Sequence, residues 1–279
     1  MKQSFQFLTD DDLSLMVDRW QHPDADTPWV VLSHGGGQTR HSWQETGDML
    51  ARSGWNVLAY DHRGHGESGW SADGSYPLPR FAKDQQQLVN SLPGKPVLVG
   101  ASLGGLSALL AEGESPENHY RAIILVDITP QMNQQGALQI LEFMESSLSE
   151  GFASLDEVAD VIAGYTGRSK RINPEGLRKN LRLCDDGKYR WHWDPAFLTI
   201  RDDYDTSPQR LIDAARNIDL PMLLVRGRES DVVTEDVAKE FLELVPHCEY
   251  VDIKDARHMV AGDRNTVFSE EILKFLQRL

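Results

Sequence analysis

Short runs of consecutive apolar residues recur along the chain, and longer stretches with helical periodicity separate them. The apolar runs are rich in Val, Ile and Leu, which favours strands. Helical spacing of apolar positions marks residues 42–53, 78–91 and 265–279. The predicted strands are residues 6–8, 13–20, 29–33, 56–60, 96–100, 122–127, 222–226 and 249–253. Strands that alternate with helices predict an α/β fold, in which a mostly parallel sheet has helices on both faces.

Residues 130–207 break this alternation. They contain no clear strand pattern, and three stretches (138–148, 155–163 and 174–183) carry helical periodicity. Ser154-x-x-Glu157 has the form of a capping box at a helix start. We therefore expect a core domain made of residues 1–129 and 208–279, with a mostly helical insertion over 130–207. Insertions at the carboxyl edge of such a sheet usually cover the ligand crevice.

The most informative motif is Gly-Ala-Ser-Leu-Gly at residues 100–104, which follows a predicted strand and precedes a predicted helix. This is the setting of a nucleophile elbow, in which a sharp turn presents the serine at the sheet edge. A Gly-rich turn carrying a serine without function is the alternative. Small neighbours are needed because the turn strains the serine backbone, so Ser102 is the candidate nucleophile.

A serine nucleophile needs a base and an orienting acid. His258 follows the last predicted strand and is the best candidate base. Asp231 follows the strand 222–226 and is the preferred acid, which yields the order Ser, Asp, His of α/β-hydrolases. Asp127, at the end of the strand 122–127, is a competing acid, and Glu229 is a third choice.

Taken together, these motifs resemble the α/β-hydrolase superfamily over nearly the whole chain outside the insertion. His34-Gly35-Gly36 followed by Trp43 resembles the oxyanion loop of the family. The segment 61–68, Asp-His-Arg-Gly-His-Gly-Glu-Ser, is similar to the family pattern after its fourth strand. The residue before His258 is Arg257 where the family usually has glycine.

The resemblance implies that the insertion is a helical cap domain. It also implies that the backbone N–H groups of Gly36 and Leu103 form the oxyanion hole. In this family the loop histidine, here His34, supports loop geometry. His62 and His65 are expected to serve loop structure, and Arg63 to anchor its loop.

Three tryptophans are candidate substrate-binding residues. Trp191 and Trp193 share one side of an extended segment in the insertion, and Trp43 follows the oxyanion loop. Either they line an acyl pocket or they pack the cap against the core, and the sequence leaves both open.

Composition and charge argue against several classes of binding partner. Lys and Arg number 28 against 43 Asp and Glu, a formal net charge of −15, which disfavours nucleic acid and anionic membranes. The two cysteines, Cys184 and Cys248, are read as free thiols, and the first residues lack a secretory signal, so we expect a cytoplasmic protein. No metal-ligand spacing is evident, so we expect no metal and no cofactor. Whether the chain forms a homo-oligomer stays open.

The sequence therefore predicts a serine hydrolase that cleaves a small ester or related acyl substrate through an acyl-enzyme. A cofactor-free haloperoxidase (perhydrolase) and a carbon–carbon bond hydrolase could use the same triad. A ligand receptor without catalysis is the alternative of another class.

Overall fold

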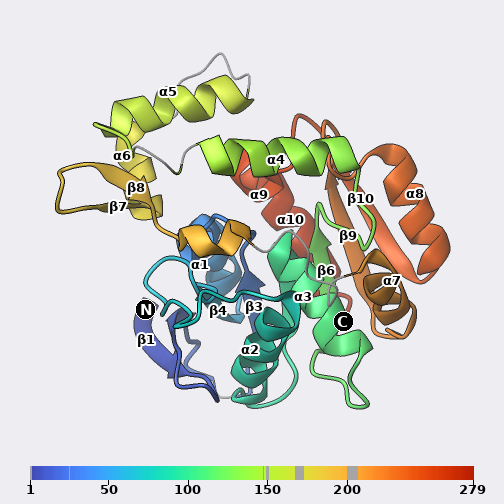
Figure 1. Ribbon diagram of the computed structural model, residues 1–279. Helices are drawn as coiled ribbons and strands as arrows, with labels where there is room; N and C mark the ends of the chain where they lie inside the picture. The colour runs from blue at the N-terminus through green and yellow to red at the C-terminus, as the bar shows by residue number, and fades with distance from the viewer. Residues whose placement is uncertain (1, 25, 147, 149–150, 167–172, 200–206) are drawn as a thin grey trace.

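The computed structural model describes residues 2–24, 26–146, 148, 151–166, 173–199 and 207–279. An eight-stranded sheet runs in the order β1-β2-β4-β3-β5-β6-β9-β10 (Figure 1). β2 pairs antiparallel with both β1 and β4, while every other pairing in this sheet is parallel. Its strands are β1 (Lys2–Leu8), β2 (Ser14–Trp20), β3 (Trp29–Ser33), β4 (Asn56–Tyr60), β5 (Val97–Ala101), β6 (Ala122–Val126), β9 (Met222–Gly227) and β10 (Cys248–Ile253).

Helices cover both faces of this sheet. One face carries α2 (Leu78–Asn90), α3 (Leu103–Gly113), α7 (Pro208–Arg216) and α8 (Glu235–Leu244). The other face carries the 3₁₀ turn η1 (Arg40–Trp43), α1 (Gln44–Arg52), α9 (Val260–Asp263) and α10 (Asn265–Leu276). The predicted α/β class, with a mostly parallel sheet between helical layers, is confirmed.

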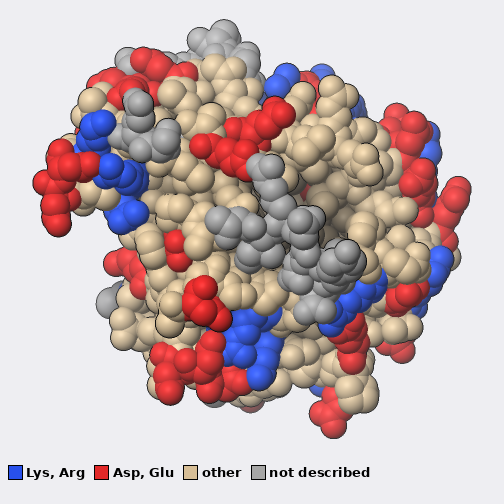
Figure 2. All heavy atoms as spheres, in the orientation of Figure 1, with Lys and Arg blue, Asp and Glu red and all other residues tan. Residues whose placement is uncertain are grey.

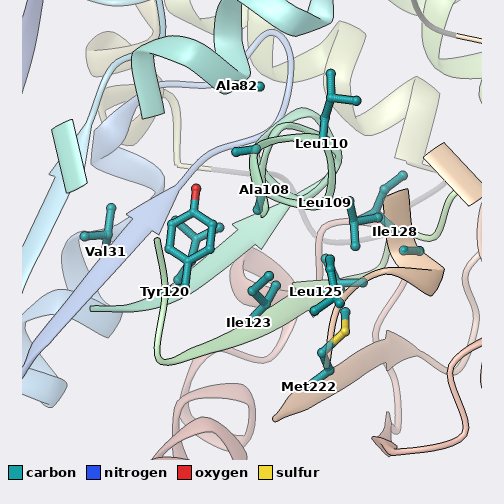
Figure 3. Close-up of a cluster of buried hydrophobic side chains, with 14 of the residues drawn as sticks. Val31, Ala82, Ala108, Leu109, Leu110, Tyr120, Ile123, Leu125, Ile128 and Met222 are labelled. Atoms are coloured by element: carbon teal, nitrogen blue, oxygen red, sulfur yellow. The ribbon is translucent and has the colours of Figure 1, made fainter. Parts of the chain in front are cut away.

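The central strands are uniformly apolar because both of their faces are buried. In β6, Ile123 and Leu125 face the core under α3, whereas Ile124 faces the opposite core. Figure 3 shows the first of these two cores, where Leu109 of α3 packs above Leu125 and Met222. This two-sided burial explains why the predicted strands 29–33 and 56–60 match β3 and β4 residue for residue.

The segment between β6 and α7 departs from the sequence prediction, which found no clear strand there. It contains α4 (Gln134–Ser146), α5 (Leu155–Thr166), α6 (Pro174–Leu177), η2 (Arg178–Asn180) and η3 (Pro195–Thr199). It also contains a separate antiparallel pair, β7 (Leu181–Leu183) with β8 (Tyr189–Trp191). The expectation of one helix over 174–183 is therefore wrong. A helix of one turn gives way to a 3₁₀ turn and then a strand, because the strand β8 supplies a partner that sequence periodicity does not reveal.

Six parallel strands bring their loops to one edge of the sheet. The carboxyl ends of β4, β3, β5, β6, β9 and β10 lie at the same edge, since parallel strands share one direction. In Figure 1 the inserted elements α4, α5, β7 and β8 lie above this edge. Ser102, Asp127 and His258 all follow strands that end there.

Acidic side chains outnumber basic ones in the chain, with 43 Asp and Glu against 28 Lys and Arg. In Figure 2, Asp and Glu side chains form several groups on the displayed face, with fewer Lys and Arg side chains between them. Both cysteines, Cys184 and Cys248, are free thiols. Within the described ranges, no helix is both long enough and apolar enough to cross a bilayer.

Candidate active site

Ser102 occupies a strained turn between β5 and α3. Its φ of 44° and ψ of −114° lie in a region that costs on the order of 1–3 kcal/mol and clusters at functional sites. Glycines let the turn form. A Cβ added to Gly100 would lie 2.6 Å from the Gly105 nitrogen, and one added to Gly104 would lie 2.5 Å from the Ser33 carbonyl oxygen. The strand, turn and helix therefore have the form that the motif predicts.

His258 lies in the loop between β10 and α9, and its ring meets a buried carboxylate. Its Nδ1 lies 2.8 Å from Oδ2 of Asp127, the residue that follows β6. The Asp127 side chain is fully buried, while 20% of the His258 side chain is exposed. Asp127 thus holds the imidazole on its Nδ1 side, while part of the ring stays exposed.

The Asp127 carboxylate has three hydrogen-bond partners. Oδ1 accepts the backbone N–H of Gly227 at 2.9 Å, and Oδ2 accepts the hydroxyl of Ser230 as well as Nδ1–H of His258. An ionised carboxylate has no proton to donate, so it only accepts hydrogen bonds. The bond to such a carboxylate must run from Nδ1–H, and an imidazole that is protonated at Nδ1 alone has its lone pair on Nε2.

The sequence preference for Asp231 as the partner of His258 is wrong, and the competing residue Asp127 takes that place. Asp231 is exposed to solvent, whereas its neighbour Ser230 points inward and bonds Asp127. Glu229, the third choice, is 57% exposed and faces Arg257. The reason is local: adjacent residues of a turn point to different sides, and here the serine takes the inner position.

The close approach of two loops also depends on a glycine. A Cβ added to Gly227 would lie 2.2 Å from the carbonyl oxygen of Arg257. The loop that carries His258 therefore passes directly against the end of β9. Arg257 itself has a half-exposed side chain, so the residue that departs from the family pattern is turned outward.

The predicted oxyanion loop passes beside Ser102. A Cβ added to Gly35 would lie 3.2 Å from the Cβ of Ser102. His34 braces this loop, since its Nδ1 donates to the Gly35 carbonyl at 2.8 Å and its Nε2 accepts the backbone N–H of His62 at 3.0 Å. Leu103, the other predicted donor, is the first residue of α3, where backbone N–H groups have no partner within the helix.

His65 holds the same loop from the other side. Its Nε2 accepts the backbone N–H of Gly37 at 3.1 Å, and its Nδ1 donates to the Arg63 carbonyl at 3.0 Å. Burial lowers the pKa of His34 to about 4 and of His65 to about 3, because a charged ring is poorly solvated there. Burial lowers the pKa of His62 as well. These rings are neutral structural groups, as expected.

The segment 61–68 folds around one carboxylate. Asp61 accepts the backbone N–H of Arg40 at 2.6 Å and of Glu67 at 2.9 Å, and it pairs with the Arg40 guanidinium. A Cβ on Gly66 would lie 2.2 Å from Asp61 Oδ2, so only glycine fits there. Arg63 anchors its loop as expected, through buried bonds to Asp84 at 2.6 and 2.7 Å.

The three tryptophans have different environments. Trp43 is 1% exposed and packs beside Phe268 in the core under α10, so its predicted contact with substrate is wrong. Trp191 contacts the rings of Phe143 and Phe152 within the insertion, which is a packing role. Trp193 is 3% exposed and lies over the oxyanion loop, where its Nε1 would be 3.8 Å from a Cβ on Gly37.

Several site residues escaped the sequence prediction. Met144 and Phe197 roof the oxyanion loop: a Cβ on Gly37 would lie 2.9 Å from Met144 Cε, and a Cβ on Gly36 would lie 3.2 Å from the Phe197 ring. Ser230 is the third, through its bond to Asp127. No sequence signal marks Met144 or Phe197, but the Ser-Asp pair at 230–231 after a predicted strand could have singled out Ser230.

The hydroxyl of Ser102 has no hydrogen-bond partner in the part of the chain that the structure describes. Catalytic hydrogen bonds often tighten only when substrate binds. Among the same residues, no group of three His, Cys, Asp or Glu side chains could hold a metal ion.

The strand order, the strained serine at the end of β5 and the histidine after the last strand define an α/β-hydrolase. A family model described as "Serine aminopeptidase, S33" matches residues 25–265, and the chain belongs to this family. It is an enzyme of the α/β-hydrolase superfamily, as the sequence predicted. A receptor without catalysis is therefore set aside.

The similarity to known proteins covers most of the chain. Esterase Rv0045c of Mycobacterium tuberculosis is 30% identical over 258 residues, which are 88% of this chain and 80% of the esterase. The bifunctional esterase/perhydrolase DCH of Acinetobacter calcoaceticus is 21% identical and covers 96% of this chain and 98% of its own length. The crystal structure of E-2-(acetamidomethylene)succinate hydrolase has a TM-score of 0.81 at 21% identity, covering 99% of this chain and 100% of that one.

Proposed function

We propose that this protein is a serine esterase that cleaves small, uncharged esters through an acyl-enzyme intermediate. The observation that carries the proposal is the 2.8 Å bond between His258 Nδ1 and Asp127 Oδ2, at the sheet edge where Ser102 is held in a strained turn. The similarity to an esterase at 30% identity supports the same class of reaction.

Each group has a defined task in this reaction. His258 Nε2 takes the proton of Ser102 as the serine oxygen attacks the ester carbonyl. Asp127 keeps the imidazole in the Nδ1–H tautomer and stabilises the imidazolium that forms. The backbone N–H groups of Gly36 and Leu103 bind the oxyanion. His258 then protonates the leaving alcohol, and water activated by the same nitrogen releases the acid and restores Ser102.

The roof over the oxyanion loop supports an uncharged acyl group. Met144, Trp193 and Phe197 contribute thioether and aromatic surface, and two of them contact the loop glycines closely. Since these side chains supply no charge to neutralise an anion, a carboxylate or phosphate on the acyl group would be poorly solvated there. We infer on the same contacts that residues 130–207 act as the cap of this site.

We also infer that the enzyme acts in the cytoplasm. The two free thiols support a reducing compartment, where cysteines stay unpaired.

The test compares the wild-type chain with Ser102→Ala. The variant should lose hydrolysis of p-nitrophenyl acetate by several orders of magnitude and should no longer be labelled by a fluorophosphonate. Ser91→Ala, which changes an exposed serine at the end of α2, is the matched control and should behave as wild type. Undiminished labelling of the Ser102 variant would contradict the proposal.

A perhydrolase is the second candidate, favoured by the similarity to an esterase/perhydrolase over 96% of the chain. The same acyl-enzyme would be attacked by peroxide in place of water. Peroxide-dependent bromination of a dye, measured in acetate buffer beside ester hydrolysis, separates the two reactions. Cleavage of a carbon–carbon bond in a diketone, without ester hydrolysis, would favour the third reaction considered for this triad.

A further inference from the structure

The hydroxyl of Ser230 bonds the oxygen of Asp127 that also holds His258. Ser230 lies in the loop after β9 and is 6% exposed. Asp127 Oδ2 therefore accepts two donors, one from the imidazole and one from a side chain 103 residues away in sequence. A single buried oxygen links all three residues.

The direction of the Ser230 hydrogen bond follows from its other partners. The backbone N–H groups of Val232 and Val233 both donate to Ser230 Oγ, each at 3.2 Å. A hydroxyl has one proton and two lone pairs, and these two bonds occupy the lone pairs. The proton of Ser230 is thus left for Asp127. The serine is therefore a donor to Asp127 Oδ2, as the imidazole is.

We propose that Ser230 is a positioning residue of the active site: its hydroxyl orients the Asp127 carboxylate so that Oδ2 meets His258 Nδ1. The inference rests on the proposed function, since it assigns Ser230 to the same serine hydrolase site. Without this donor, the partners left to the carboxylate among the described residues are the Gly227 N–H on Oδ1 and the imidazole on Oδ2, so we expect it to rotate more freely. Rotation would weaken the hold on the imidazole.

A purely structural role for Ser230 in its turn is the competing explanation. The turn also has backbone support, because the Ser230 N–H donates to the Gly227 carbonyl and the Glu229 N–H donates to the Ala256 carbonyl, both at 2.9 Å. A structural role predicts a loss of stability without a change at His258. The experiment must therefore observe His258 itself.

The first measurement is the NMR signal of the His258 Nδ1 proton in chains labelled with ¹⁵N-histidine, assigned with a His258→Gln variant. This proton is expected far downfield and slow to exchange in wild type. In Ser230→Ala it should shift and exchange faster, and Ser230→Thr, which keeps the hydroxyl, should restore the wild-type signal. Ser269→Ala, which removes a buried hydroxyl in α10, is the matched control. Ser230→Cys, a weaker donor of similar shape, replaces the alanine variant if that variant does not fold.

The second measurement is kinetic. Ser230→Ala should lower kcat for an ester by about ten- to a hundred-fold, the range for losing a hydrogen bond to a charged group, with KM changed little. In the Asp127→Asn background the same substitution should change kcat by less than about twofold, because both act through one carboxylate. Equal loss in both backgrounds would assign Ser230 a separate structural role.

The two proposals fail in different ways. A wild-type chain that hydrolyses no ester and resists fluorophosphonate would overturn the esterase, while the NMR signal still reports on Ser230. An active enzyme whose Ser230→Ala variant keeps both the wild-type signal and the wild-type kcat would overturn the role of Ser230 alone.

Discussion

His258 Nδ1 and Asp127 Oδ2 lie 2.8 Å apart, although 131 residues separate them in the chain. The two residues follow β10 and β6, and β9 lies between these strands in the sheet. The imidazole therefore reaches over the end of one strand to meet the carboxylate. Gly227, the last residue of β9, makes this approach feasible because it has no side chain.

Asp127→Asn should lower kcat for ester hydrolysis by roughly 10⁴-fold, because an amide at this position favours the wrong imidazole tautomer. Asp231→Asn is the matched control, since Asp231 is exposed in the same region and should leave kcat unchanged. Steady-state kinetics on p-nitrophenyl acetate measures both. If Asp231→Asn lowered kcat strongly while Asp127→Asn stayed active, Asp231 would be the catalytic acid, as the chain order favoured.

Gly36→Val should lower kcat by about 10²–10³-fold, the typical cost of losing one oxyanion donor, with a smaller change in KM. The branched side chain would meet the Phe197 ring, which already lies 3.2 Å from the position of a Cβ. Phe197→Ala in the same chain should recover part of the loss. Gly164→Ala, on α5 with nothing within 4 Å of the added carbon, should have wild-type kinetics. Full activity of Gly36→Val would show that the backbone N–H of Gly36 is not an oxyanion donor.

Arg40→Ala should destabilise the fold by about 3–5 kcal/mol, because the buried Asp61 loses its paired guanidinium, while Asp18 keeps its pair with Lys2. The Asp61 side chain is fully buried, so its charge depends on the guanidinium more than an exposed carboxylate would. Urea unfolding followed by circular dichroism gives the free energy. For comparison, Arg278→Ala removes a pair whose side chains are both 52% exposed, and its effect should be at most about 1 kcal/mol. Similar effects of the two substitutions would contradict the argument.

Acid should destabilise the fold through the histidines of the oxyanion loop. Since burial holds the pKa of His65 near 3 against 6.5 for an exposed ring, the unfolded chain binds the extra proton first as pH falls. The stabilisation is present above pH 6.5 and is lost between pH 6.5 and about 3. Asp84 and Glu112, whose pKa values burial raises, act in the opposite direction, so a variant is needed to isolate the histidine.

His65→Gln supplies that comparison. The difference in unfolding free energy between wild type and this variant should shrink as pH falls from 7.5 to 5. Leu98→Ala, a cavity variant without a titratable group, should lower the stability by the same amount at both pH values. A difference that stays constant with pH for His65→Gln would show that this ring does not carry the effect.

Local sequence was enough to predict the strands that are buried on both faces. The runs at 29–33 and 56–60 are apolar throughout because helices cover both faces of the sheet, and their strands match the prediction residue for residue. The elbow at Ser102 was also predictable, since the glycines that permit its strained turn lie next to it in sequence. The helix expected over 174–183 failed because β7 exists only by pairing with β8.

Only the tertiary structure decided which residues meet. Asp127 and Asp231 both follow strands that end at the same sheet edge, so the sequence could not choose between them. The choice depends on a turn that points Ser230 inward and Asp231 outward, and on the left-handed backbone of Asp127, with φ of 49°. Likewise, Trp43 is a core residue and Trp193 covers the oxyanion loop because of how distant helices and the insertion pack on the sheet. Such contacts form between segments far apart in the chain, and local propensity carries no information about them.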